Sequence, residues 1–333
     1  MITLVCHWMR LKVVLIISFV VTCGFADVEL SDEKSYFGMC DASAGIALTP
    51  DLFVAADDES NQLRTYSRSR PGHPLHKLDL SRFLMIGRGD PETDVEGAAQ
   101  IGEIVYWITS HGRNKDGKFR PSRQRFFATR LHDGAQPHLE LVGQLYAGLL
   151  RDLSTAPQLR QFDLGDASRR APKDKGGLNI EGLCSRPDGS LLIAFRNPIP
   201  DKQALIVPLL NPADLIAGKG MRAKFGEPIL LDLDKNGVRD ILQQNGTYYL
   251  IAGPRTGKDD FQLYSWDGAS KLNLLHDWRK GSFNPEAVLA VPDAPNKLII
   301  LSDDGSRKTG GTPCKELPEA QRRFRSVLPT LPN

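Results

Sequence analysis

The sequence predicts an all-β protein, a β-propeller with five blades of four antiparallel strands each. Three observations lead to this prediction. A short strand start that is rich in Gly or Ala recurs five times along the chain, and each start is followed by further apolar segments in the same order. The 30 Gly and 22 Pro supply many tight turns between these segments. A unit that recurs on this scale indicates a closed or stacked array.

The first strand of each unit is predicted to line the central axis. These five inner strands are expected at 42–47, 94–99, 179–184, 237–242 and 284–289. Aligning them places one residue of each unit at an equivalent position. The equivalent residues are Ala44, Glu96, Glu181, Arg239 and Glu286. Inner strands wound about one axis would bring these positions together in a ring.

The remaining strands follow turns such as 187–189 and 244–246. The second strands are nearly continuous apolar runs, typical of strands covered on both faces, at 52–56, 104–110, 191–195, 248–252 and 298–302. Third strands are expected at 62–67, 125–131, 204–210, 261–266 and 323–328. Fourth strands are expected at 74–80, 138–145, 228–233 and 271–278. The fifth unit has no fourth strand of its own, and the segment 27–37 could supply it and close the ring.

The interval between the second and third units is the longest. We interpret it as an insertion at about 146–178 with a short helix over 149–162. Residues 27–333 then form a single propeller domain. The alternatives are a sixth blade hidden in this interval and a β-fold other than a propeller.

The N-terminus has the pattern of a secretion signal. Arg10 and Lys12 precede an apolar stretch over 13–22, and small residues follow at 24–26. Residues 1–26 are therefore predicted to be a signal peptide, and the mature protein to be periplasmic or secreted with no membrane span. A membrane anchor is the alternative, but the apolar stretch is shorter than a spanning helix needs.

Charge and cysteine content narrow the function classes. The full chain has 42 Lys and Arg against 40 Asp and Glu, and the signal contains two basic residues and no acidic one. A neutral mature protein argues against nucleic-acid binding through bulk charge. We also expect the protein to be a monomer. No two cysteines have metal-ligand spacing. Cys40 and Cys314 could form a disulfide that staples the two ends of the fold, whereas Cys184 is expected to be a buried thiol.

Polar residues are predicted to converge at one end of the propeller, because an inner strand starts beside the end of the second strand. Pairs at a spacing of two, such as Asn179 with Glu181 and Asn284 with Glu286, should share one side of their strand. The second strands end near further polar residues, namely His111, Arg113, Arg196, Asn197, Arg255, Asp303 and Asp304. This end could be a network of structural ion pairs or a ligand pocket at the channel mouth.

Two chemistries suit a pocket of this composition. Glu96, Glu181 and Glu286, with the amides of Asn179 and Asn284, offer the oxygen ligands that Ca²⁺ prefers. The arginines instead suit an acidic ligand, because a guanidinium matches a carboxylate or phosphate in a bidentate way. For that ligand the candidate binding residues are Arg113, Arg196, Asn197, Arg239, Arg255, Asp303 and Asp304. The glutamates are candidate bases, and His111 is the histidine placed as a general acid or base.

Several of these segments together resemble a family of secreted bacterial proteins catalogued as a domain of unknown function. The segments are 94–99, 110–114, 176–182, 195–198 and 301–305. The resemblance implies an exported propeller. More distantly, the Glu-Gly strand start is similar to that of gluconolactonase and lactonase propellers and of the esterase-like phytase group. In the lactonases a glutamate at this place ligates the metal, which implies such a role for Glu96, Glu181 and Glu286, although Arg239 departs from that pattern.

The sequence therefore leads to two hypotheses of different classes. The first is an exported propeller that binds a small acidic molecule at the channel mouth and hydrolyses an ester, lactone or phosphoester with the help of a cation. The second is a non-catalytic binding or scaffold propeller of the cell envelope.

Overall fold

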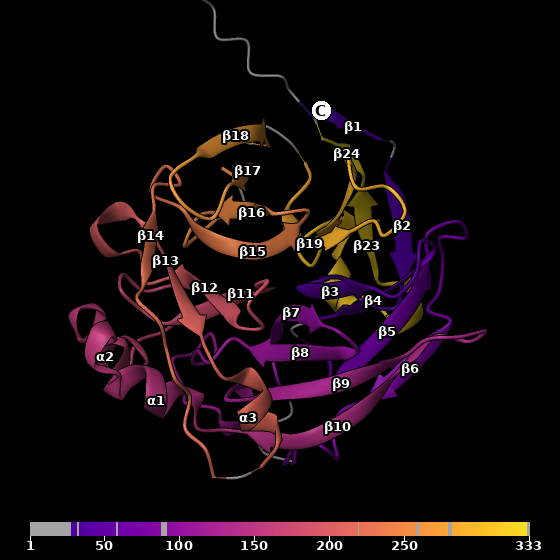
Figure 1. Cartoon of the computed structure of the whole chain (residues 1–333). Helices are drawn as coiled ribbons and strands as arrows, with labels where there is room; N and C mark the ends of the chain where they lie inside the picture. Colours follow the sequence, from indigo (N-terminus) through magenta and orange to yellow (C-terminus); the bar gives the residue numbers. More distant parts are fainter. Residues whose placement is uncertain are drawn as a thin grey trace, which may run out of the picture.

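The computed structural model describes residues 28–331 except 32, 58, 88–91, 219, 258–259 and 279–281. Five four-stranded antiparallel sheets surround a central axis, and β3, β7, β11, β15 and β19 are the innermost strands (Figure 1). The predicted five-bladed propeller is confirmed. The predicted signal peptide, and the membrane anchor that was its alternative, lie outside the described residues.

Each blade runs from the axis outward in chain order. The first contains β3 (Ala44–Ala47), β4 (Leu52–Ala56), β5 (Gln62–Ser67) and β6 (His76–Asp79). The second contains β7 (Val95–Ile101), β8 (Ile104–Thr109), β9 (Phe126–His132) and β10 (His138–Tyr146). The third contains β11 (Asn179–Ser185), β12 (Leu191–Asn197), β13 (Ala204–Leu209) and β14 (Ile229–Leu231). The fourth contains β15 (Gly237–Gln244), β16 (Thr247–Gly253), β17 (Gln262–Trp266) and β18 (Leu272–Asp277).

The fifth blade joins the two ends of the chain. It contains β19 (Pro285–Ala290), β20 (Leu298–Ser302), β23 (Arg323–Val327) and, as its outer strand, β2 (Lys34–Phe37). Beside it, β1 (Glu29–Leu30) pairs with β24 (Pro329–Thr330). The predicted closure by an N-terminal strand is therefore confirmed. A disulfide between Cys40 and Cys314, with an S–S distance of 2.00 Å, ties the ends together a second time.

The hydrophobic core lies between neighbouring blades, because the strands are covered on both faces. One cluster joins Leu192 and Ala194 of β12 to Val238 and Ile241 of β15. Others join the remaining neighbours in the same way, with Trp107 among the largest buried side chains. The apolar second strands thus stack the sheets around the axis.

The connection from β10 to β11 contains the helical elements α1 (Leu149–Thr155), η2 (Pro157–Phe162) and α2 (Leu164–Ala167). The sequence predicted one helix over 149–162, and the structure breaks it at Ala156, whose backbone is extended. Pro157 explains the break, because a proline disfavours helical backbone at the residue before it. No strand of a sixth blade lies in the described residues of this connection.

Short elements outside the blades complete the described structure. They are η1 (Pro121–Arg123), η3 (Pro200–Lys202), α3 (Pro212–Ile216), β21 (Lys308–Thr309), β22 (Thr312–Pro313), η4 (Cys314–Glu316) and η5 (Glu319–Gln321). Within the described ranges no helix combines the length and apolar character required to cross a membrane.

Candidate functional site: a glutamate ring at the channel mouth

Four of the five inner strands carry a β-bulge at the ring position. The strand register skips Glu96 in β7, Glu181 in β11, Arg239 in β15 and Glu286 in β19. In β3 the pairing is continuous through Ala44. A bulge adds a residue that is not paired and re-aims its side chain. It can therefore direct each charged side chain out of its own sheet and toward the axis.

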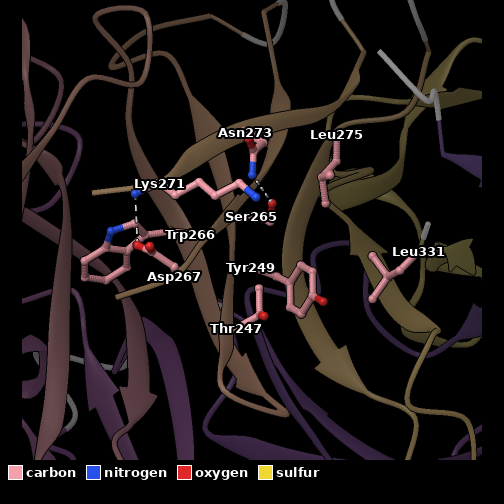
Figure 2. A pocket seen from close by; sticks show the side chains of 9 residues that line it. All are labelled: Thr247, Tyr249, Ser265, Trp266, Asp267, Lys271, Asn273, Leu275 and Leu331. Carbon is pink, nitrogen blue, oxygen red and sulfur yellow. Dashed lines mark hydrogen bonds between the residues drawn. The ribbon is translucent and has the colours of Figure 1, made fainter. Parts of the chain in front are cut away.

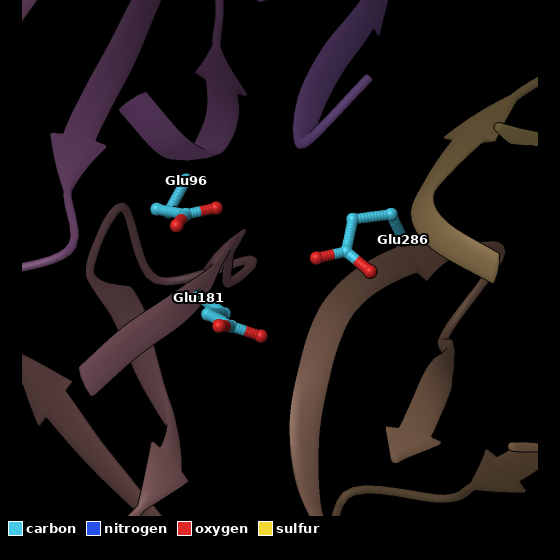
Figure 3. Close-up of side chains that lie close together, drawn as sticks. All are labelled: Glu96, Glu181 and Glu286. Carbon is cyan, nitrogen blue, oxygen red and sulfur yellow. The ribbon is translucent and has the colours of Figure 1, made fainter. Parts of the chain in front are cut away.

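The bulges bring the three glutamates together at the axis. Oxygen atoms of Glu96, Glu181 and Glu286 all lie within 4.8 Å of one another, and Figure 3 shows the three carboxylates converging from separate inner strands. All three side chains are buried. We call these three residues the glutamate ring.

Two arginines neutralise part of this charge. Arg239 Nε lies 2.9 Å from Glu181 Oε2, and a terminal nitrogen of Arg239 contacts Glu286 Oε1. Arg196 places a terminal nitrogen 2.7 Å from Glu181 Oε1. The amide of Asn179 also donates to that oxygen, at 2.5 Å. Glu181 is thus contacted by both arginines and by Asn179, whereas Glu286 Oε2 is buried with no hydrogen-bond partner among the described residues.

Burial and like charge shift the ionisation of this cluster. Burial raises the pKa of Glu286 to about 7; Arg239 opposes the shift, and Glu181 and Asp303 add to it. Burial by itself lowers the pKa of Arg239, but the neighbouring carboxylates outweigh it and raise this pKa. The cluster therefore contains a permanent cation and more carboxylates than its arginines neutralise.

Glycines next to the bulges let the inner strands approach closely. A Cβ atom on Gly97 would lie 2.9 Å from the Cβ of Leu183, and one on Gly182 would lie 3.1 Å from the side chain of Ile241. In the first blade, a Cβ on Gly45 would lie 3.0 Å from the side chain of Leu289. The strands are therefore packed tightly around the axis just beyond the ring.

Three other residues that the sequence predicts to bind the ligand hold one loop. This loop, residues 168–177, leads from α2 to β11, and we call it the strap. Arg113 Nε donates to the Ser168 carbonyl at 3.0 Å. The Asn197 amide donates to two further strap carbonyls at 2.9 and 2.8 Å, and Arg255 donates to the Lys173 carbonyl. Arg113, Asn197 and Arg255 thus fasten the strap over second, third and fourth blades.

His111, predicted as a general acid or base, is buried. Its Nδ1 lies 2.7 Å from the Thr109 carbonyl, which leaves Nε2 without a partner among the described residues. Burial lowers the pKa of His111 to about 4, against a weaker raising effect of the hydrogen bond to Thr109. His111 is therefore neutral at physiological pH, and no described contact links it to the glutamate ring.

The remaining predicted residues either act on the glutamate ring or make contacts elsewhere in the fold. Asp303 acts electrostatically on both Arg239 and Glu286. Asp304 instead pairs with Arg325 through two contacts of 2.7 Å. The Asn284 amide donates to the Asp303 carbonyl at 3.1 Å.

Two residues around Arg239 were not among the candidate site residues. Asp240 is buried and accepts hydrogen bonds of 2.8 Å from the backbone N–H groups of Ile241 and Val288. Burial raises the pKa of Asp240 well above its usual value in spite of these bonds. Phe261 places its ring 5.8 Å from the Arg239 guanidinium. The bulges of β7 and β11 did have a signal in the sequence, because a glycine inside a strand often marks a bulge or a close backbone approach.

Two hollows lie away from the glutamate ring. One, of about 310 Å³, is lined by the far ends of all five inner strands, including Ala98, Leu183 and Leu289. The other, of about 250 Å³, lies on the outer part of the fourth blade and reaches Leu331 (Figure 2). There Tyr249 lies beside polar side chains such as Asn273, which donates to Ser265 at 3.3 Å. Neither hollow includes a residue of the ring.

Comparison with known proteins gives a family match but no activity. Residues 138–296 match the model of a family described as "Protein of unknown function (DUF3616)". The predicted resemblance to a family catalogued as a domain of unknown function is therefore confirmed. No curated protein matches the chain.

Among solved structures, the chain is similar to the PQQ-bound aldose sugar dehydrogenase of Streptomyces coelicolor. The two share 13% identity over 91% of this chain and 99% of that one, with a TM-score of 0.47. The chain is also similar to the glutaminyl cyclase of Myxococcus xanthus, with 12% identity over 92% of this chain and 97% of that one and a TM-score of 0.45. A third similar structure is Pseudomonas fluorescens PhoX in complex with vanadate, with 12% identity over 87% of this chain and 69% of that one and a TM-score of 0.40.

Proposed function

We propose that this chain is an exported propeller that binds a small acidic ligand at the channel mouth with the help of a divalent cation such as Ca²⁺. The proposal extends to hydrolysis of an ester, lactone or phosphoester in that ligand. The convergence of three carboxylates from separate blades within 4.8 Å supports it. Carboxylates gathered in this way are costly unless a cation or a network of donors accompanies them.

The ring fits a hard cation in ligand type and spacing. Ca²⁺ takes carboxylate oxygens at about 2.3–2.6 Å, so ligands on opposite sides of one ion are about 5 Å apart. The free oxygen of Glu286 can serve as a ligand while its other oxygen keeps the Arg239 contact. With every carboxyl group ionised, the glutamate ring and Asp303 would carry four negative charges against the two positive charges of Arg196 and Arg239, so a divalent ion would balance the remainder.

Each group would have a distinct part in binding. When bound, the cation would act as a Lewis acid toward a carbonyl or phosphoryl oxygen of the ligand. Arg196 contacts Glu181 of the ring, and its guanidinium could orient an acidic group of the ligand. The tight packing beyond the ring limits the depth to which a ligand can enter.

A non-catalytic scaffold is the second candidate, and one observation favours it. Arg239 and Arg196 already pair with Glu181, and Arg239 also contacts Glu286. Ion pairs of this kind can hold blades together without binding any ligand. Breaking such a buried pair is strongly destabilising, which by itself would conserve the arrangement in a scaffold.

A melting experiment separates the two candidates. We expect Ca²⁺ to raise the melting temperature of the mature protein and EDTA to reverse the effect, because a ligand of the folded state stabilises it by mass action. Glu96→Gln and Glu181→Gln should abolish the calcium effect. Glu103→Gln, at an exposed turn between β7 and β8, is the matched control.

The same preparation tests catalysis. Sugar acids, lactones and phosphate esters would be added with Ca²⁺, and both the melting temperature and turnover measured. Turnover that disappears in Glu96→Gln supports the hydrolase. If neither metals nor these compounds shift the melt, and no turnover is seen, the scaffold is the better description.

A further inference from the structure

Two exposed basic segments lie at the same end of the propeller as the glutamate ring. One is the loop 111–120 between β8 and β9, and the other is the strap, 168–177. In an antiparallel blade the end of the second strand lies beside the start of the inner strand. The loop begins where β8 ends, and the strap runs to the start of β11. Both segments therefore belong to the end where the ring is.

Side-chain bonds fix these two segments to one another. Arg113 donates to the Gly117 carbonyl in the loop and to the Ser168 carbonyl in the strap, each at 3.0 Å. The strap is fastened in turn by Asn197 and Arg255. We call the two segments together the collar. Its surface is held in place by contacts from three blades.

The collar is basic although the predicted mature chain is neutral. Each segment contains four basic residues and one acidic residue. Lys115, Lys118, Lys173 and Lys175 are exposed. Two strap arginines, 169 and 170, are paired with Asp166. Exposed lysines therefore supply much of the positive charge of the collar surface, which suits an acidic partner.

One aromatic side chain is exposed among the basic residues of the collar. Phe119 is 52% exposed and lies between Lys118 and Arg120 in the sequence. It is the only aromatic residue among the large hydrophobic side chains that are exposed in the described part of the chain. Single strands of nucleic acid are usually bound by stacking successive bases on several aromatic rings. One ring among lysines better suits a sugar with acidic groups.

We propose that the collar binds an acidic oligosaccharide, with its carboxylates on the lysines and one sugar on Phe119. This surface lies outside the glutamate ring, and its binding does not depend on the function proposed for the ring. Exposed ion pairs of this type weaken as salt rises. An oligosaccharide on the collar would also lie beside the channel mouth.

Oligogalacturonate of about six sugars is a suitable probe, with maltohexaose as its neutral counterpart. Binding to the whole mature protein would be measured by calorimetry at low and at physiological salt, in EDTA. We expect oligogalacturonate to bind, more weakly at the higher salt, and maltohexaose not to bind. Lys173→Glu with Lys175→Glu should weaken binding about tenfold or more. Lys115→Glu with Lys118→Glu should do the same, and Phe119→Ala should weaken it at both salt concentrations.

The matched control reverses two exposed lysines at the opposite end, Lys224 and Lys271. Both follow third strands, whose ends lie away from the ring. Lys224→Glu with Lys271→Glu should leave binding unchanged, and melting curves should show every variant folded. Equal loss in the control pair would overturn the proposal, as would the absence of binding to oligogalacturonate. Tighter binding of a hexameric oligothymidylate than of oligogalacturonate would also overturn it. Because EDTA is present throughout, a failure here is distinct from a failure of the calcium site.

Discussion

Arg239 occupies the ring position that the second, third and fifth blades give to a glutamate. Its guanidinium lies between Glu181 and Glu286 and faces the ring of Phe261. Because this charge is buried, its pairing with two carboxylates is a condition for its presence in the core. The residue thus supplies one positive charge that does not depend on any bound ion. The three carboxylates of the glutamate ring outnumber the two arginines that contact them.

His111 predicts a pH dependence of stability. Its pKa is about 4 in the folded protein, and about 6.5 when unfolded. Above the unfolded value both states are neutral, and the folded state keeps its full stability. As the pH falls from 6.5 toward 4, the unfolded chain takes up a proton that the folded protein excludes. The free energy of unfolding should therefore fall by about 3 kcal/mol through this residue.

The measurement is urea unfolding at pH 7.5 and at pH 4.5. In His111→Gln the difference between the two free energies of unfolding should be smaller than in the wild type by about 2–3 kcal/mol. His76→Gln, at an exposed position of β6, is the control. An unchanged difference in His111→Gln would show that burial does not hold this histidine neutral.

At the scale of the element, the bulge and the glycine after it act together. The bulge directs the glutamate to the axis, and the glycine lets the next inner strand approach. In β7 and β11 the two features are adjacent, as Glu96-Gly97 and Glu181-Gly182. In these two strands a side chain after the glutamate would clash with the next inner strand and push the two strands apart. The Glu-Gly pair is therefore a structural unit and not only a chemical motif.

Gly97→Ala tests this unit. The added Cβ would lie 2.9 Å from Leu183, a distance that requires the strands to move. We expect the free energy of unfolding to fall by about 1–3 kcal/mol. Gly87→Ala is the control, because a Cβ at that position would have no atom within 4 Å among the described residues other than its chain neighbours. Equal stability of both variants in urea unfolding would show that close packing at Gly97 is not required.

For the whole molecule, closure of the ring depends on residues far apart in the chain. Strand β2 completes the fifth blade, and the disulfide joins Cys40 to Cys314 across 274 residues. Aromatic packing reinforces the junction, since the ring of Tyr36 stacks on Phe324 at 5.2 Å. A propeller that opened here would expose the edge of β23 and the apolar faces that are packed between the first and fifth blades.

Removal of the disulfide should lower stability. Cys40→Ser with Cys314→Ser is expected to reduce the free energy of unfolding by about 2–5 kcal/mol, because the bridge constrains the unfolded chain. A reducing agent should bring the wild type to the level of the double variant. It should have no effect on the double variant itself, whose remaining described cysteine, Cys184, is buried. A wild type that is insensitive to reduction would contradict this account of closure.

Most of the propeller was predictable because each repeat has a recognisable order of apolar segments and turn residues in the sequence. The apolar second strands, the turns and the missing fourth strand of the last unit gave five blades and their closure. The break at Pro157 was also signalled locally, although the sequence was read as one helix. The hydrogen-bond partners of the polar side chains were harder to predict from the sequence. Asn197 and Arg255 donate to backbone carbonyls of the strap, and these contacts could not be predicted because no local pattern specifies the path of the strap.

The sequence by itself determined the order of strands, the equivalence of the ring positions and the chemical types of the groups there. These follow from periodicity and turn residues, which act over a few positions of the chain. Only the tertiary structure decided which charges meet. Four bulges, a tight layer of glycines and a strap from another blade set those distances, and each depends on contacts between segments that are far apart in the chain.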